Sequence, residues 1–323
     1  MIRSNDMIKD AAVRACVTPF GLGAILLCLL LPRPAWPHGF IGDRFLPTTL
    51  SIEDPFAQDE LTFVLNHIRE PGEGEVPSTL ATEIEAEYAK RITPHFALSL
   101  GGAYAHLNPD SEPARDGFGN LEIAGKWQLL TDASHETVVS LGLAAEVGNT
   151  GGADVEADDF STLSPALFFG KGFGNLPETA WYLRPLAVTG VLSAGFPTDA
   201  RTVRGADVER NPVMLNWGFS LLYDLHYLQT RVRDVGLQGF AERLIPIVEV
   251  ALDTCLNRGC GGETSGTVNP GFIYVGRHMQ FGLEVRIPVN DRTGENVGLL
   301  FQVHLFLDDL FPNTLGKPLF SAG

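Results

Sequence analysis

The chain has 323 residues, a formal net charge of −16 and 45% apolar residues. The strong negative charge argues against nucleic acid as a partner. Beyond the N-terminal region no apolar stretch reaches the roughly 20 residues that a membrane helix needs, so a helical inner-membrane bundle is excluded.

Residues 1–38 have the organisation of a secretory signal peptide. Basic residues at positions 3, 9 and 14 precede an apolar run over 20–31, and proline and small residues follow it. The run is too short to cross a bilayer comfortably as a helix. We expect export and cleavage near Ala35 to Pro37. An uncleaved anchor is the alternative, because Arg33 makes the cleavage region poor.

Residues 39–60 are rich in Pro, Asp and Phe and show no sustained period of either the helical or the strand kind. We interpret this segment as an extended periplasmic lead-in at the mouth of the domain that follows. The pattern leaves open whether the segment plugs that domain.

From residue 61 to residue 311 the chain alternates polar and apolar positions over about twelve segments of strand length. In the clearest of them Glu83, Glu85 and Glu87 share one face, and the opposite face carries Ile84 and Tyr88. Three carboxylates in a row need water, whereas the opposite face is apolar. The other clear segments are 95–107, 121–130, in which Leu129 is expected on the apolar face, 137–148, 213–224, 280–289 and 297–306.

The connections between these segments alternate in length. Residues 93–94 and 131–136 are tight turns, whereas 108–119, 149–160 and 194–211 are long and rich in Gly, Pro and Asp. A soluble β-sandwich also alternates, but this asymmetry and the charged inner face favour a transmembrane antiparallel up-and-down β-barrel of about twelve strands. With the N-terminus in the periplasm, the long loops lie outside the cell. Residues 312–323 are then a periplasmic tail.

The inward-facing charges are the candidate functional residues. Ala, Gly and Ser positions between them suggest a constricted aqueous path in a barrel of this size, and the alternative is a plugged interior that only holds the barrel shut. Excess carboxylate in the path predicts a preference for cations. The predicted pore-lining residues are Glu83, Glu85, Glu87, Glu122, Lys126, Glu146, Arg243, Glu249, Glu284 and Arg286.

Other chemistry is sparse in the sequence. Cys255 and Cys260 are predicted to form a disulfide, because the spacing is short and the compartment oxidising. No cofactor or metal is predicted: the histidines are scattered singly, and the acidic loop 154–159 lacks the spacing of an EF-hand. Ser134 and His135 lie in a predicted inner turn, and no Gly-x-Ser-x-Gly motif occurs, so we predict no enzyme activity.

Several segments resemble uncharacterised bacterial proteins related to the phenol-degradation meta-pathway outer-membrane family. They are His38 to Phe45, Asp54-Pro55-Phe56, Arg184 to Ala187, Asn269-Pro270-Gly271 and Phe306 to Pro312. The resemblance spans nearly the whole mature chain. It implies a barrel porin or transporter associated with aromatic catabolism, and it implies no catalytic residues.

The predicted function is an outer-membrane channel or porin-like transporter for small solutes, including hydrophobic or aromatic compounds. The expected partners are outer-membrane lipid, lipopolysaccharide, the barrel-assembly machinery during insertion, and the solute itself. Two alternatives remain: a barrel enzyme acting on membrane lipids, and a non-conducting structural or binding barrel.

Overall fold

The computed structural model describes residues 39–72, 77–204, 207–258 and 260–320. The predicted signal peptide, residues 1–38, lies outside this range, as do residues 321–323 of the predicted tail. No helix within the described ranges is long and apolar enough to cross a membrane.

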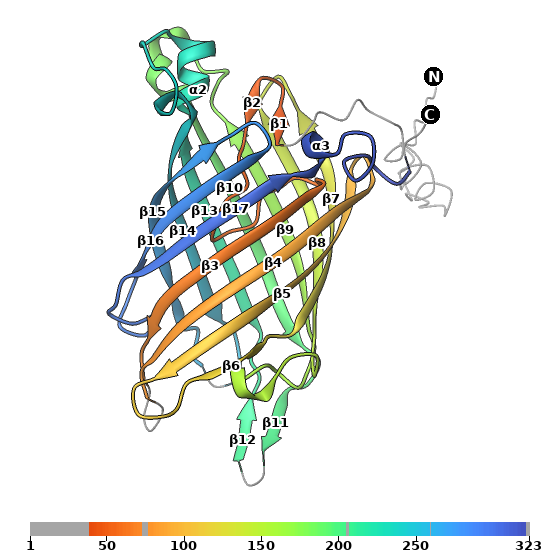
Figure 1. Cartoon of the computed structure of the whole chain (residues 1–323), viewed down its shortest axis with the longest axis vertical. Coiled ribbons are helices and arrows are strands. Elements are labelled where there is room, and N and C mark those ends of the chain that lie inside the picture. Colours follow the sequence, from red (N-terminus) through yellow and green to blue (C-terminus); the bar gives the residue numbers. More distant parts are fainter. Residues whose placement is uncertain (1–38, 73–76, 205–206, 259, 321–323) are drawn as a thin grey trace, which may run out of the picture. The chain divides into compact units, whose positions relative to one another are not determined.

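Twelve strands form one closed antiparallel barrel, which confirms the predicted fold (Figure 1). Neighbours along the chain pair with each other, and the last strand pairs with the first, with Phe301 opposite Leu65. The strands are β3 (Glu60–Glu70), β4 (Thr79–Thr93), β5 (Phe96–Pro109), β7 (Leu121–Asp132), β8 (Thr137–Val147), β9 (Thr162–Gly172), β10 (Leu186–Pro197), β13 (Met214–Tyr223), β14 (Leu244–Cys255), β15 (Thr264–Val275), β16 (Met279–Pro288) and β17 (Gly298–Phe306).

Alternation along each strand separates an apolar outer face from a polar inner face. On β16 and β17 the paired residues Leu283 and Phe301 are 38% and 39% exposed on the outside, whereas Gln280 and Gln302 are buried inside. Because β17 pairs with β3, each of the twelve barrel strands has a neighbour on both sides, as a bilayer requires.

One expected facing is wrong. The pairing of β7 with β8 shifts between Gln128 and Leu130, and Leu130 rather than Leu129 projects outward at 46% exposure. A bulge of this kind inserts one extra residue, so the alternation changes phase beyond it. A period-2 pattern read from sequence cannot show where such an insertion falls.

The tight turns predicted at 93–94 and 131–136 lie at one end of the barrel, and the long loops predicted at 108–119, 149–160 and 194–211 lie at the other. The asymmetry is not complete, because the long connections 173–185 and 224–243 lie at the same end as the tight turns. One end, the turn end, carries the short connections, α3 (Leu307–Leu310) and the chain segments before β3 and after β17 (Figure 1). Its longer connections hold η2 (Glu178–Leu183), α2 (Leu225–Tyr227), η3 (Leu228–Val232) and η4 (Ala241–Arg243). The other end, the loop end, carries β6 (Arg115–Phe118), η1 (Ala153–Val155), β11 (Arg201–Arg204) and β12 (Asp207–Arg210).

The orientation in the membrane gives a first testable prediction. An epitope tag inserted at Ala153, which is exposed in η1 at the loop end, should be labelled by antibody on intact cells. The same tag at Ala133, in the β7 to β8 turn, should be labelled only after permeabilisation. Labelling at Ala133 on intact cells with none at Ala153 would reverse the orientation.

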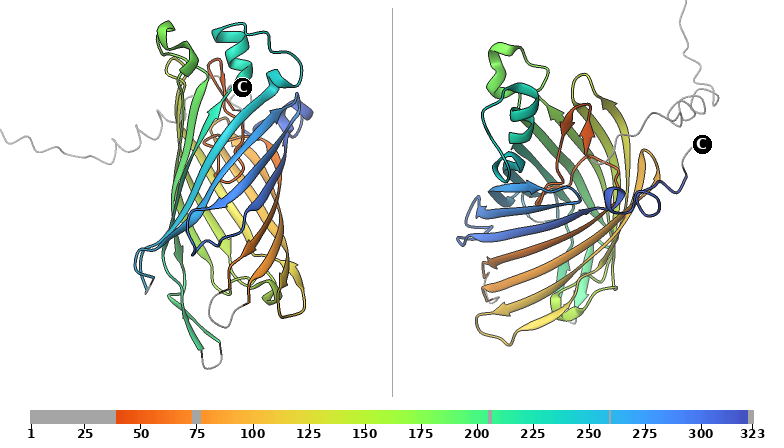
Figure 2. Two further views of the ribbon diagram at one scale, coloured as in Figure 1. Left: turned by 90° about the vertical axis from the view of Figure 1, so that its left-hand side faces the viewer. Right: turned by 45° about the horizontal axis from the view of Figure 1, so that its top comes forward.

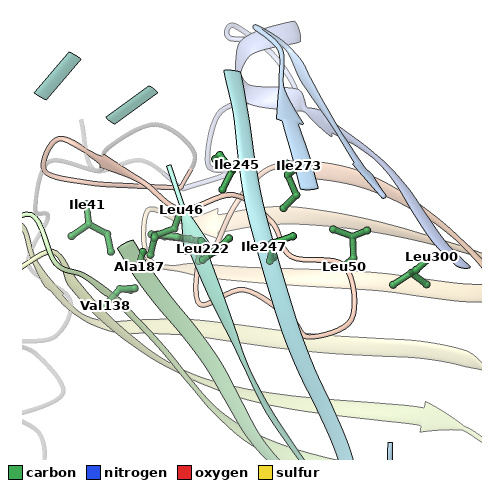
Figure 3. Close-up of a cluster of buried hydrophobic side chains, with 11 residues drawn as sticks. Ile41, Leu46, Leu50, Val138, Ala187, Leu222, Ile245, Ile247, Ile273 and Leu300 are labelled. Carbon is green, nitrogen blue, oxygen red and sulfur yellow. The ribbon is translucent and has the colours of Figure 1, made fainter. Parts of the chain in front are cut away.

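The segment before β3 lies inside the barrel and not along its outside. Strands β1 (Phe40–Ile41) and β2 (Arg44–Phe45) form a small hairpin at the turn end, and residues 46–59, here called the plug, continue into the lumen (Figure 2). Figure 3 shows the resulting apolar core, in which plug side chains pack against the inner wall. The core comprises Ile41, Leu46, Leu50 and Phe56 with Val138, Ala187, Leu222, Ile245, Ile247, Ile273 and Leu300.

After β17 the chain turns back onto the barrel. Lys90 donates to the carbonyls of Leu315 (2.7 Å) and Lys317 (2.6 Å), and the backbone N–H of Leu319 donates to the carbonyl of Arg91 (3.1 Å). The described part of the predicted tail is therefore bound to the end of β4.

Candidate functional site in the lumen

Inner-face side chains of β16 and β17 hold the backbone of the plug. Gln280 donates to the carbonyl of Thr48 (2.5 Å), and Gln302 donates to the carbonyl of Thr49 (2.8 Å). Both glutamines are fully buried, and Gln280 also donates to the side-chain oxygen of Gln302 (2.8 Å). These side chains supply hydrogen bonds that an irregular buried segment cannot make to itself.

Two predicted pore-lining carboxylates hold the next part of the plug. The N–H groups of Leu50 and Ser51 donate to Oε2 of Glu249 at 3.0 and 2.6 Å. The Ser51 hydroxyl donates to Oε2 of Glu284 (3.2 Å). Glu249 and Glu284 are fully buried, so they lie against the plug and not against open water.

The opposite wall of the barrel binds the far side of the plug. Lys126 on β7 donates to Oε1 of Glu53 (2.6 Å) and to the carbonyl of Asp54 (2.7 Å). Ser140 on β8 donates to the carbonyl of Pro55. The plug is thus attached to both walls, and it spans the lumen between them.

Glycines on the inner wall provide the space that the plug occupies. A Cβ at Gly282 would lie 2.5 Å from Cδ1 of Leu50. A Cβ at Gly218 would lie 2.9 Å from Cγ2 of Ile52, and it would lie still closer to the carbonyl oxygen of Val250 on the adjacent strand. Real side chains do not make contacts this short. Glycine at these positions therefore leaves room for the plug.

A buried ion pair fixes the root of the plug at the turn end. Arg44 is fully buried, and its Nε donates to Oε2 of Glu136 (3.1 Å) while its Nη1 donates to the carbonyl of Pro185 (3.0 Å). The Tyr227 ring lies 3.6 Å from the guanidinium carbon, and the Tyr227 hydroxyl donates to Oε1 of Glu136 (2.8 Å). Burial, together with this hydrogen bond, raises the pKa of Tyr227 to about 12. Breaking such a pair typically costs about 3–5 kcal/mol, because it leaves a buried charge without a partner.

The Glu83, Glu85 and Glu87 ladder lines the space that the plug leaves free. Three lumen cavities of 260, 210 and 230 Å³ follow one another past the plug and share lining residues. The first contains Glu83 and Glu85, the second Glu85 and Glu87, and the third Glu87. The ladder therefore forms one continuous acidic edge along all three cavities.

Small residues form much of the remaining wall of the third cavity. Ala97 and Ser99 on β5 face it, as the alternation predicted, together with Gly142 on β8 and Ser164 on β9. Across the cavity lie plug side chains such as Phe56. The third cavity is therefore lined both by the plug and by small residues of the barrel wall.

The other predicted pore-lining residues fall into distinct places. Glu122 and Lys126 line the third cavity, and Arg286 lines the first while donating to Oδ1 of Asn66 (2.6 Å). Glu146 accepts a hydrogen bond from Asn120 (3.0 Å) near the loop end. Arg243 lies apart from this group, at the end of η4 outside the strands, where it lines a cavity at the turn end.

No local sequence pattern predicts that Arg44, Glu136 and Tyr227 form a group. One sequence feature does mark Arg44: it is a basic residue next to Asp43 and Phe45 in a segment that also contains many apolar residues. Its partners lie 92 and 183 positions further along the chain, and nothing in a local pattern connects residues so distant.

The turn containing Ser134 and His135 does not have the geometry of a catalytic triad. Oγ of Ser134 lies 3.0 Å from Nδ1 of His135, and Oδ2 of Asp132 lies 2.7 Å from the same ring nitrogen. A triad uses one nitrogen for the nucleophile and the other for the carboxylate. Asp132 also accepts from the backbone N–H groups of Ser134 and His135, which is an ordinary Asx-type turn.

Two further predictions concern the loop end. Cys255 and Cys260 form the predicted disulfide, with their Cα atoms 5.8 Å apart, and it closes the start of the β14 to β15 loop. In the acidic loop Glu156 pairs with Arg115 (2.9 Å). Within the described ranges no group of three or more His, Cys, Asp or Glu side chains is placed to hold a metal ion.

The closed barrel, its apolar outer face and its polar lumen define a transmembrane β-barrel of the outer-membrane type. No family model and no curated protein matches the sequence. Among solved structures the chain is similar to the COG4313 outer membrane channel from Pseudomonas putida F1, with a TM-score of 0.54, 10% identity, and coverage of 81% of this chain and 99% of that one. It also matches the NanC porin with a TM-score of 0.47 and 10% identity, and the KdgM porin with a TM-score of 0.43 and 11% identity. Each of these matches covers 76% of this chain and 98% of the other. At these identities the similarity shows the fold.

Proposed function

We propose that the protein is a channel of the Gram-negative outer membrane that passes small solutes through a constricted, plug-lined lumen. The observation that carries the proposal is the chain of three cavities joined along the Glu83, Glu85 and Glu87 edge. A continuous row of carboxylates is unfavourable in a dry lumen, because removing such groups from water without partners costs free energy. A barrel that served only as a scaffold would gain nothing from this row.

The plug makes the channel narrow and selective. It binds Glu249 and Glu284 on one wall and Lys126 on the other, so a solute passes beside it rather than through an open pore. The similarity to a structure described as an outer membrane channel supports conduction over a lipid-modifying enzyme. The turn at Ser134 also supports conduction over an enzyme, because Ser134 and Asp132 contact the same nitrogen of His135 and so do not form a catalytic triad.

The solute class follows from two arguments. Excess carboxylate along the path favours cationic or neutral solutes over anions. The sequence resemblance to the phenol-degradation meta-pathway family extends the class to small hydrophobic or aromatic compounds, and we propose membership of that family. Lipopolysaccharide and outer-membrane lipid would surround the barrel, and the assembly machinery would insert it.

Neutralising the acidic edge tests the conduction proposal. Replacing Glu83, Glu85 and Glu87 together by Gln keeps their shape and hydrogen bonding, so the barrel should fold. We expect the cation-to-anion permeability ratio to fall at least about twofold, because three charges leave the path. Reversal potentials measured in a salt gradient across a planar bilayer give this ratio.

A matched variant removes three exposed carboxylates at the loop end, those of Glu112, Glu209 on β12 and Glu295. Its selectivity should stay closer to that of the parent, because these groups lie outside the lumen. Unchanged selectivity in the ladder variant would place the edge outside the conduction path. No conductance in any of the proteins would favour the structural or binding barrel.

A further inference from the structure

A separate cavity of 430 Å³ lies at the turn end, beyond the lumen. Its walls come from the β1 to β2 hairpin, from the connection between β13 and β14, and from the ends of β14, β15 and β17. It shares no lining residue with the three lumen cavities. Its volume is within the range of small-molecule sites, so it can hold a ligand of its own.

The inner part of this cavity is apolar and aromatic. Phe45 and Phe306 meet edge to face with ring centroids 6.3 Å apart, and Phe40 lies 5.2 Å from Phe45. Ile245 and Val275 complete this surface. A flat or branched hydrocarbon body would bury well here, because aromatic walls offer both area and edge-to-face contacts.

The acidic side chains around the cavity are already bound to partners. Asp43 pairs with Arg231 (2.9 Å), and Glu242 pairs with His226 (3.0 Å). Asp224 accepts from the backbone N–H of Tyr227 (2.9 Å), and burial raises the pKa of its carboxyl. The carboxylates of Asp43 and Glu242 are thus directed toward Arg231 and His226, and that of Asp224 toward the backbone of Tyr227.

The basic side chains are not balanced in the same way. Arg243 and Arg277 also line the cavity, and among the described residues neither has an ion-pair partner. Both side chains are exposed and so form the rim of the cavity, whereas Ile245 and Phe306 in its wall are buried. Guanidinium groups bind carboxylate and sulfonate oxygens in a forked geometry, so the rim favours an anionic head group.

We propose that the turn-end cavity is a binding site for a small amphipathic anion, with its apolar body against Phe45 and Phe306 and its acidic head group at Arg243 and Arg277. The site does not depend on conduction through the lumen. Because Phe40, Asp43 and Phe45 belong to the hairpin, a bound ligand would also join the root of the plug to the ends of β14 and β15.

Calorimetric titration of the full-length barrel in lipid nanodiscs tests the proposal, with 2-naphthoate as the probe and empty nanodiscs as the blank. We expect saturable binding at one site. The neutral analogue 2-naphthalenemethanol and the small anion acetate should each bind at least about tenfold more weakly, since one lacks the charge and the other the body. Equal binding of either analogue would overturn the assigned ligand class.

Two variants locate the site. Replacing Arg243 and Arg277 together by Gln should weaken 2-naphthoate binding at least about tenfold. The matched control replaces Arg115 and Arg292 by Gln; these arginines lie at the loop end with side chains 32% and 52% exposed, and the variant should bind as the parent does. Val275→Trp should fill the cavity and also abolish binding. Absence of saturable binding, or full affinity in the Arg243 and Arg277 variant, would refute the site.

Discussion

Deleting residues 40–57 should raise the single-channel conductance at least about threefold, because the deletion removes the hairpin and most of the plug from a lumen wide enough for water. The barrel strands begin at Glu60, and the contacts of Asp59 with Lys90 and Arg91 are kept. A planar bilayer measures the conductance. A heat-modifiable gel shift shows whether the barrel is folded.

A point variant tests the role of the plug without a deletion. Gly282→Leu places a side chain where Leu50 of the plug now lies, so the plug must move and the conductance should change. Gly102→Leu is the control, since a Cβ there lies 3.5 Å from the nearest atom, a side chain on the adjacent strand β7. A folded deletion variant with the parent conductance would show that the plug does not limit the path.

Leu283→Arg should impair membrane insertion by roughly 2–4 kcal/mol if the residue lies near the midplane of the bilayer, because a guanidinium would face hydrocarbon. Leu283 projects outward from the middle of β16 beside Phe301. The folded fraction after dilution from urea into lipid vesicles, read by the gel shift, measures the loss.

Ser193→Arg on β10 is the matched control, because Ser193 lines the third lumen cavity and Arg there would face water. It should fold as well as the parent. Equal folding of the two Arg variants would mean that the outer face does not meet lipid. Alternation alone also marks Gln280 and Gln302 as tolerant positions, but Arg at either would displace the plug that these glutamines bind.

Local patterns in the sequence were sufficient for the barrel. The period-2 alternation of Glu83, Ile84 and Glu85 sets the two faces of β4, and the tight turns after β4 and β7 mark one of the two ends. Each depends on neighbours a few positions apart, so a single strand or hairpin already carries the information. The short spacing of Cys255 and Cys260 made their disulfide predictable for the same reason.

The content of the lumen was decided by tertiary structure. Alternation places Glu249 and Glu284 on the inner face, but only the path of residues 46–59 shows that they bind backbone N–H and hydroxyl groups and not open water. Arg243 falls outside the strands, because the β13 to β14 connection extends to that residue. An irregular segment has no periodic pattern from which its path could be predicted. Its partners, such as Glu136 for Arg44, come near it only when the barrel closes.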